Sequence, residues 1–235
     1  MNAQLAHSFD RIGQLELFRS LPDGAIESVR AAMHIEHAPK DAVICGQGQR
    51  VDRACALAAG SLRIVQTGSD GGQTIVRFIR PGEMFGTLPL FTDHRCPADA
   101  IAAEASTVLT WSERSLLELM TRHPPIAHNV IQVLGTRMAQ LQERLRELTT
   151  QRVEQRIAHA VLRLARQYGN EVRGRITIDV PLRRKDLADF AGTTLHTASR
   201  VVSVWEKTGL LVSSGRRLVI HDLAAINKLA ESCTD

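Results

Sequence analysis

The chain has little that would mark a membrane or secreted protein. No apolar run reaches the roughly 18 residues that a membrane span needs. The N-terminal stretch MNAQLAHSFDRIGQLELF lacks the basic start and apolar core of a signal peptide. Its four cysteines (Cys45, Cys55, Cys96 and Cys233) contain no CxxC pair, and a cytosol does not favour structural disulfides. We therefore expect a cytoplasmic protein with no membrane partner.

The motifs of catalysis are also lacking. The glycine-rich stretch CGQGQR does not end in Gly-Lys-Ser/Thr and so is not a phosphate-binding loop. The HIEH stretch at His34 to His37 does not have the HExxH spacing of a zinc protease. No nucleophile–base pair or paired carboxylates stand out. We expect a protein that is not an enzyme.

Charge is present but unevenly distributed. The net charge is +4, yet residues from Gln151 onward hold 14 Lys and Arg against 9 Asp and Glu. The first 150 residues hold 15 against 16. Basic charge collected in the C-terminal part is typical of a module that binds a polyanion, although a chance surface imbalance explains the charge alone equally well.

The first half of the chain predicts short strands. From about Ala42 to Trp111, Val- and Ile-rich runs alternate with glycine turns, which is typical of an antiparallel sandwich or barrel. The stretch TGSDGGQT predicts a hairpin tip, because Asp-Gly readily supplies the positive φ that such turns need. Short helices are expected before this block.

A heptad pattern follows. Apolar residues recur at alternating steps of three and four between charged flanks, which favours a helix paired with its twin in a two-stranded coil over one packed on its own domain. The predicted dimer seam consists of Ile131, Leu134, Met138, Leu141, Leu145 and Leu148.

The C-terminal part predicts a winged helix-turn-helix. One helix over about Arg184–Ala191 buries Leu187 and Phe190, a Gly-Thr-Thr turn follows, and a second helix runs from about Leu195 to Lys207. Two strands around Ser213-Ser214-Gly215 then form a wing. In the second helix, Ala198, Val201, Val202 and Trp205 have the spacing of a buried stripe.

The opposite face of that second helix predicts DNA readout. Arg200 can contact guanine O6 and N7 bidentately, which is worth about 1 to 3 kcal/mol of discrimination. The predicted base-reading residues are His196, Thr197, Ser199 and Arg200, and the predicted phosphate contacts are Arg183, Arg184, Lys185, Thr194, Arg216 and Arg217.

Over nearly its full length the chain resembles the CRP/FNR superfamily of bacterial transcription regulators. The motifs that carry the resemblance are GSLRIV, RPGEMFGTLPLF, the seam helix and DLADFAGTTLHTASRVVSVWEKTGLL. The resemblance implies an α+β protein with a β-roll of the cyclic-nucleotide-binding type at residues 1–124, a dimerisation helix and hinge at 125–150, and a winged helix-turn-helix at 151–235. It also implies a homodimer on a two-fold symmetric DNA site, with RNA polymerase as a further partner of an activator.

Two departures from the family pattern concern specificity. The family's recognition helix commonly reads E-x-x-[SG]-R, and here His196 replaces the glutamate while Ser199 and Arg200 match. Members that bind cyclic AMP look like G-E-L-x-L-F followed by R-S-A, but Thr87 replaces the Glu and Pro97-Ala98 replaces the Arg-Ser pair. We therefore expect an altered half-site and no cyclic AMP binding. The candidate effector pocket comprises Gly86, Thr87, Leu88, Arg95, Cys96, Pro97 and Ala98.

The sensed signal is left open by the sequence. The oxygen-sensing branch uses a run of N-terminal cysteines, and here no cysteine precedes Cys45, so no iron–sulfur cluster is expected. Similarity to the nitric oxide and denitrification branch implies haem as a candidate cofactor, with an axial ligand among His94, Cys96, His34 and His37. The alternatives are a cysteine-based redox response, a regulator without an effector, and a cyclic-nucleotide-type binder with an altered pocket.

Overall fold

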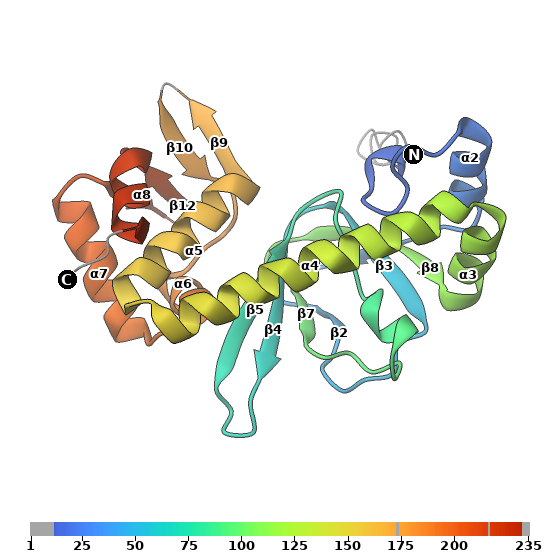
Figure 1. Ribbon diagram of the computed structural model, residues 1–235, viewed down its shortest axis with the longest axis horizontal. Helices are drawn as coiled ribbons and strands as arrows, with labels where there is room; N and C mark the ends of the chain where they lie inside the picture. Colours follow the sequence, from blue (N-terminus) through green and yellow to red (C-terminus); the bar gives the residue numbers. More distant parts are fainter. Residues whose placement is uncertain (1–11, 173, 216, 232–235) are drawn as a thin grey trace. The chain divides into compact units, whose positions relative to one another are not determined.

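The computed structural model in Figure 1 describes residues 12–172, 174–215 and 217–231. The chain divides into two compact units. The first comprises residues 1–70 and 77–141, and the second comprises residues 71–76 and 142–235. No helix in the described part of the chain is long and apolar enough to cross a membrane.

The first unit is built on two four-stranded sheets. The strands after Ala42 follow the predicted glycine-punctuated pattern, whereas one strand, His34–Ala38, precedes the predicted block. The apolar faces of the two sheets share a core in which Leu57 and Val108 of one sheet lie with Leu62 and Ala102 of the other, all inaccessible to solvent. One sheet has the order β1 (His34–Ala38), β8 (Ser106–Ser112), β3 (Arg53–Ala59), β6 (Met84–Phe85), and the other has the order β2 (Val43–Cys45), β7 (Asp99–Ala102), β4 (Leu62–Thr67), β5 (Gln73–Ile79).

The turn between β3 and β4 requires glycine. Gly60 has φ of +88°, which only glycine adopts without strain. A Cβ at this position would lie 2.7 Å from the carbonyl oxygen of Ala105 and 2.8 Å from Cα of Ser106. The close approach of these two turns is therefore open only to a residue without a side chain.

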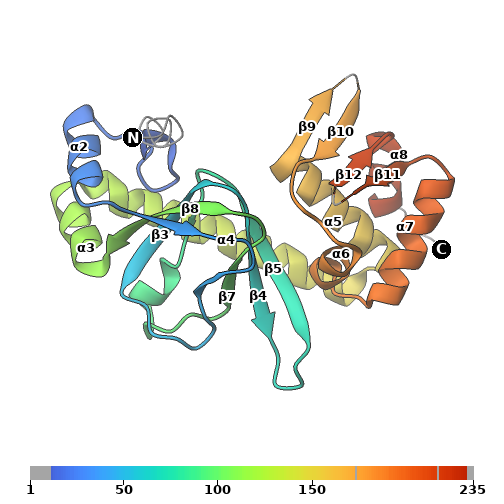
Figure 2. The same ribbon diagram turned by 180° about the vertical axis from the view of Figure 1, so that it is seen from behind.

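Helices close one end of this unit (Figure 2). Ser112 caps the start of α3, because its Oγ accepts the backbone N–H of Ser115 at 3.1 Å. Trp111 is fully buried, and its indole N–H donates to the carbonyl oxygen of Val29 at 2.9 Å. The helical elements are η1 (Ile12–Gln14), α2 (Asp23–Ala31), η2 (Leu88–Phe91), α3 (Glu113–Arg122) and the long α4 (Pro124–Thr150).

The second unit contains the predicted helix pair and wing together with two elements that the sequence pattern did not predict, β9 and α8. Its sheet has the order β11-β12-β10-β9. The elements are α5 (Val153–Tyr168), β9 (Gly169–Val172), β10 (Arg175–Ile178), α6 (Arg184–Ala191), α7 (Leu195–Lys207), β11 (Leu211–Ser214), β12 (Arg217–Ile220) and α8 (Leu223–Glu231).

The C-terminal end of α4 packs within this second unit. The Glu147 carboxylate is almost fully buried and accepts from Nη1 of Arg163 at 2.5 and 2.6 Å. Nη2 of Arg144 donates to the carbonyl oxygen of Phe190 at 2.5 Å. Burial lowers the pKa of the Arg144 guanidinium to about 10, and the nearby charge of Arg163 acts in the same direction. The last turns of α4 are thus tied to α5 and α6 by charged groups.

Candidate nucleic-acid interface

The two helices of the interface are joined by a tight turn. α6 ends at Gly192, whose φ of +65° and ψ of +48° place it in the left-handed region. The backbone N–H of Thr193 donates to the carbonyl oxygen of Ala188 at 3.0 Å, which completes the cap. Thr194 then begins α7, its Oγ1 accepting the N–H of Thr197 at 3.2 Å. Gly192 is the one turn residue for which the conformation demands glycine.

Packing of the pair follows the predicted stripe, with one difference. Leu187 and Phe190 of α6 are buried, as are Ala198, Val202 and Trp205 of α7. Val201 is only half-buried, because at 3.6 residues per turn it lies about 60° to one side of the line through Ala198, Val202 and Trp205. The indole N–H of Trp205 donates to Glu154 Oε1 of α5 at 3.3 Å.

The remaining face of α7 is open. His196 and Arg200 are exposed, while Thr197, Ser199 and Ser203 are half-buried. Among the described residues, no carboxylate pairs with Arg200. The predicted base-reading residues therefore share one face of one helix, at the end nearest the turn.

A three-way contact that spacing did not reveal holds this helix in place. Nη2 of Arg184 on α6 donates to Glu206 Oε2 at 2.7 Å, and Nη1 donates to the carbonyl oxygen of Ser199 at 3.0 Å. Glu206 Oε1 accepts the backbone N–H of Ser213 in the wing at 3.2 Å. Partial burial raises the pKa of the Glu206 carboxyl, but the hydrogen bonds from Ser213 and Arg184 outweigh it and leave that pKa below its usual value. Arg184, Glu206 and Ser213 together form what we call the brace.

The predicted phosphate-binding cations already have internal partners. Arg183 pairs with Asp186 at 3.0 Å, Lys185 with Asp189 at 3.0 Å, and Arg217 with Asp179 at 2.8 Å. More than half of each of these three cationic side chains is exposed. Only the Arg217–Asp179 pair is exposed on both sides, and such a pair is worth about 0 to 1 kcal/mol, so a phosphate can replace Asp179 at little cost. The carboxylates of Asp186 and Asp189 are 6% and 14% exposed, so removing the cation from either leaves a largely buried charge without its counterion. Arg184 differs because its guanidinium belongs to the brace, and Arg216 lies outside the described residues.

The heptad residues of α4 form an apolar stripe without cover. Ile131, Met138 and Leu145 are 68%, 59% and 63% exposed, and Leu141 and Leu148 are 53% and 42% exposed. Leu134 is half-buried against the core of the first unit. Large apolar side chains exposed at this regular spacing are typical of a surface that another chain covers.

Comparison with known families accounts for both units. The cyclic nucleotide-binding domain family matches residues 35–123, and the Crp-like helix-turn-helix domain family matches residues 155–229. The order of the two domains and the long helix between them is that of one group of regulators. The chain belongs to the CRP/FNR family of transcription regulators.

Individual members of the family are distant relatives. The cyclic AMP receptor protein of Thermus thermophilus is 27% identical over 192 residues, covering 82% of this chain and 86% of that one. The nitrogen fixation regulation protein FixK of Rhizobium meliloti is 29% identical over 176 residues, covering 75% and 77%. The solved structure of FixK2 from Bradyrhizobium japonicum has a TM-score of 0.76 at 23% identity, covering 86% of this chain and 99% of that one. The last comparison shows the shared fold.

The candidate effector residues of this CRP/FNR regulator lie along one segment, residues 86–98, which runs from the end of β6 to the start of β7. Thr87 is buried, Leu88 and Pro97 are exposed, and Ala98 is buried. Gly86 has φ of +68°, a left-handed conformation that strains residues with a side chain. The guanidinium of Arg95 donates to the carbonyl oxygen of Gly48 at 3.0 Å. Pro97, which occupies the family's arginine position, brings no charge to a phosphate.

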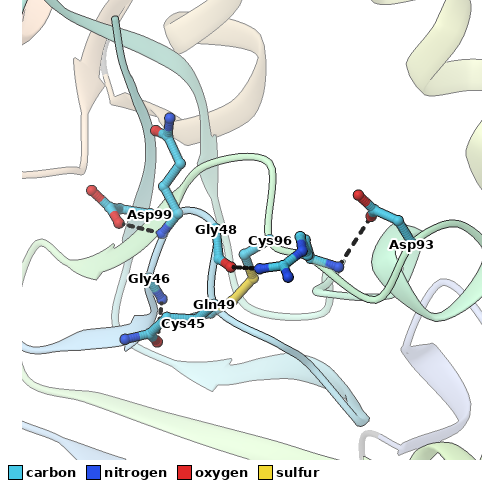
Figure 3. The surroundings of a disulfide bond; sticks show 9 residues. Cys45, Gly46, Gly48, Gln49, Asp93, Cys96 and Asp99 are labelled. Carbon is cyan, nitrogen blue, oxygen red and sulfur yellow. Dashed lines mark hydrogen bonds between the residues drawn. A yellow bond between two sulfur atoms is a disulfide. The ribbon is translucent and has the colours of Figure 1, made fainter. Parts of the chain in front are cut away.

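Cys96 of this segment is bonded to Cys45. The two Cα atoms are 6.7 Å apart, and the disulfide connects β2 to the loop before β7 (Figure 3). The expectation that these cysteines have no structural partner is therefore wrong. Fifty-one residues separate them, and no local pattern in the sequence indicates the pairing.

The predicted haem ligands are not brought together. The sulfur of Cys96 is in the disulfide, and Nε2 of His94 lies 2.9 Å from Glu113 Oε1. His34 and His37 lie on exposed positions of β1. Within the described ranges, no three His, Cys, Asp or Glu side chains gather as a metal site. The residues present do not fit an axial haem ligand facing a cavity.

Proposed function

We propose that this transcription regulator is a homodimer that binds two-fold symmetric DNA through α7. The observation that carries the proposal is the exposed face of α7, where Arg200 and His196 stand free beside a helix-turn-helix turn. Residues at the start of such a helix reach base edges in the major groove. Pairing of two chains through the exposed stripe of α4 supplies the two-fold axis.

His196 gives this regulator a half-site of its own. A glutamate at that position accepts from cytosine N4, whereas a histidine is also able to donate to a purine acceptor. We propose that Arg200 contacts a guanine, with Ser199 beside it as in the family's recognition motif, and that His196 changes the preference at the neighbouring base pair.

Selection from a random DNA library with the purified full-length protein tests this proposal. We expect enrichment of a palindrome whose half-sites are centred about one helical turn, ~34 to 36 Å, apart. Affinity for the selected site falls steeply as the salt concentration rises, because phosphate contacts release counterions. Recovery of no enriched sequence, or of a sequence without two-fold symmetry, contradicts the proposal.

We propose that neither cyclic AMP nor haem is the signal. Thr87 replaces the carboxylate, Pro97 replaces the arginine, and the Arg95 guanidinium is engaged with Gly48. The absorption spectrum of anaerobically purified protein with added haemin and nitric oxide tests the haem hypothesis, and calorimetry with cyclic AMP tests the nucleotide. A stoichiometric Soret band that shifts with nitric oxide, or measurable heat of cyclic AMP binding, overturns the respective statement. If this regulator is an activator, RNA polymerase is its further protein partner.

A further inference from the structure

In the described part of the chain, the Cys45–Cys96 disulfide is more accessible to redox reagents than the buried thiol of Cys55. Cys55 is buried, and burial raises the pKa of its thiol to about 12, so its reactive thiolate is scarce at neutral pH. Cys45 is half-buried and is the more accessible residue of the disulfide, since Cys96 is 5% exposed. We therefore expect a reductant to approach the bond from the Cys45 side.

The two bonded segments are also held by the backbone. Gly48 donates its N–H to the carbonyl oxygen of Cys96 at 2.7 Å, and Cys96 donates to that of Gln49 at 2.9 Å. Val51 donates to the carbonyl oxygen of His94 at 2.8 Å. These bonds do not depend on the sulfur atoms. We therefore expect the two segments to stay side by side after reduction, with the two thiols close enough to join again.

The disulfide acts on the segment that carries the candidate effector residues. Cys96 lies near its end, and Arg95 and Asp93 are anchored beside it by side-chain hydrogen bonds (Figure 3). His94 contacts Glu113, the first residue of α3, which leads directly into α4. This contact joins residues 86–98 to α3 and so to the start of α4, the helix of the proposed dimer contact.

We propose that the Cys45–Cys96 disulfide is a reversible redox site that locks residues 86–98, and that its reaction partner is a dithiol. The inference rests on the proposed function, because a protein that works on DNA meets thiol reductants, and disulfides in such an environment are usually transient or redox-sensing.

The exchange balances in electrons and protons. A thiolate of the dithiol attacks Sγ of Cys45, the S–S bond breaks, and Cys96 leaves as a thiolate that takes up a proton. The second thiol of the dithiol then displaces Cys45 from the mixed disulfide. The protein gains two electrons and two protons, and the dithiol is oxidised to its disulfide. A small disulfide such as oxidised glutathione reverses the reaction.

The experiment uses full-length protein with Cys233→Ser, which is reduced with the dithiol dithiothreitol and then reoxidised in glutathione buffers of increasing oxidised fraction. Alkylation with mass mapping follows Cys45 and Cys96, and hydrogen exchange follows residues 86–98. We expect both thiols to appear together and reversibly, with faster exchange in residues 86–98 after reduction. Affinity for the selected DNA site is expected to differ at least about tenfold between the two states.

Matched variants separate the redox effect from a change in folding. Cys45→Ser and Cys96→Ser each fix the reduced behaviour, whereas Cys55→Ala leaves the redox response intact. Thermal melts show whether each variant is folded.

The outcomes distinguish the two proposals. If Cys45 and Cys96 still react with the alkylating reagent in the most oxidising buffer, the proposed redox site is wrong. Reversible oxidation with equal DNA affinity in both states overturns the lock and leaves the proposed function standing. If neither state binds DNA, the proposed function fails, and hydrogen exchange alone decides whether the disulfide restrains residues 86–98.

Discussion

Arg200 is the residue on which sequence readout is expected to depend most. Replacing it with Ala removes the guanidinium while leaving the buried stripe of α7 untouched. We expect discrimination at one base pair of each half-site to fall by about 1 to 3 kcal/mol. Competition binding with all four bases at each position measures this loss.

Lys207→Ala is the matched control, because it removes the same charge from the exposed far end of the same helix. It is expected to weaken all sequences alike or not at all. A uniform loss of affinity in Arg200→Ala, without loss of discrimination, would show that Arg200 contacts phosphate and not a base.

The brace is expected to make the stability of the second unit depend on pH. Because the pKa of Glu206 is lower in the folded protein than its usual value, the unfolded chain binds more protons in that range. The Glu206 carboxylate stabilises the fold fully above the usual carboxyl pKa, and this stabilisation is lost as the pH falls through the pKa of Glu206 in the folded protein. Urea unfolding of Glu206→Gln between pH 3 and 7 should show a shallower acid limb than the native protein.

Glu171→Gln serves as the control, since Glu171 is exposed on β9 and lies outside the brace. It should leave the acid limb unchanged. Equal acid limbs in native and Glu206→Gln protein would show that the brace contributes no linkage.

Spacing predicted which residues of α7 face outward but not which charges meet. Arg200 and His196 are exposed because a helix places every third or fourth residue on one face. Arg184 and Glu206 are 22 positions apart, and their contact depends on how α6 crosses α7. The same limit hid the Glu147–Arg163 pair and the Cys45–Cys96 bond. Long-range pairs of this kind become visible only once the elements are packed.

At the scale of the element, α4 carries the sharpest prediction. Leu145→Glu places a charge in the stripe and removes an apolar side chain worth about 2 kcal/mol or more per copy. Both chains of a dimer lose it, so the dissociation constant should rise at least about 100-fold. Sedimentation equilibrium measures the change, and circular dichroism checks that the helix is intact.

Gln140→Glu is the control, because it adds the same charge at an exposed flank position. Native association in that variant, together with monomers in Leu145→Glu, locates the interface on the stripe. A Leu145→Glu protein that is still dimeric at micromolar concentration would move the interface elsewhere.

The elements that sequence analysis missed are the short ones with weak patterns. All four residues of β9 are exposed, so no alternation of apolar and polar side chains marks it as a strand. α8 spans nine residues, of which only Ile226 and Ala230 are buried. Longer elements with a regular period, such as α4 and α7, were predicted to within a few residues.

At the scale of the whole molecule, dimerisation and DNA binding should be coupled. A dimer gains from both half-sites at once, whereas a monomer binds each alone. Leu145→Glu should therefore bind the full palindrome about as weakly as it binds a half-site duplex. Fluorescence anisotropy with both duplexes checks this. A large preference of the variant for the palindrome would argue against coupling through α4.

The two halves of the chain differ in how far their structure could be predicted from the sequence. In the DNA-binding half, helix periodicity and turn residues predict the helices, the turn and the wing, so the positions of its residues could be predicted from the sequence. In the first half, Thr87 and Pro97 depart from the family motif, and a disulfide lies next to Pro97. These departures indicate which charged groups the pocket lacks, but they do not indicate what it binds. The structure was needed to show that Cys96 has a covalent partner.

The two tryptophans provide a way to watch the halves separately. Trp111 is buried in the first unit and Trp205 in the second, and each indole N–H has its own partner. The chain has no others. Changing either one to Phe leaves a single emitter whose fluorescence reports one half alone, so the order in which signal, sensor and DNA-binding domain respond can be timed without an attached dye.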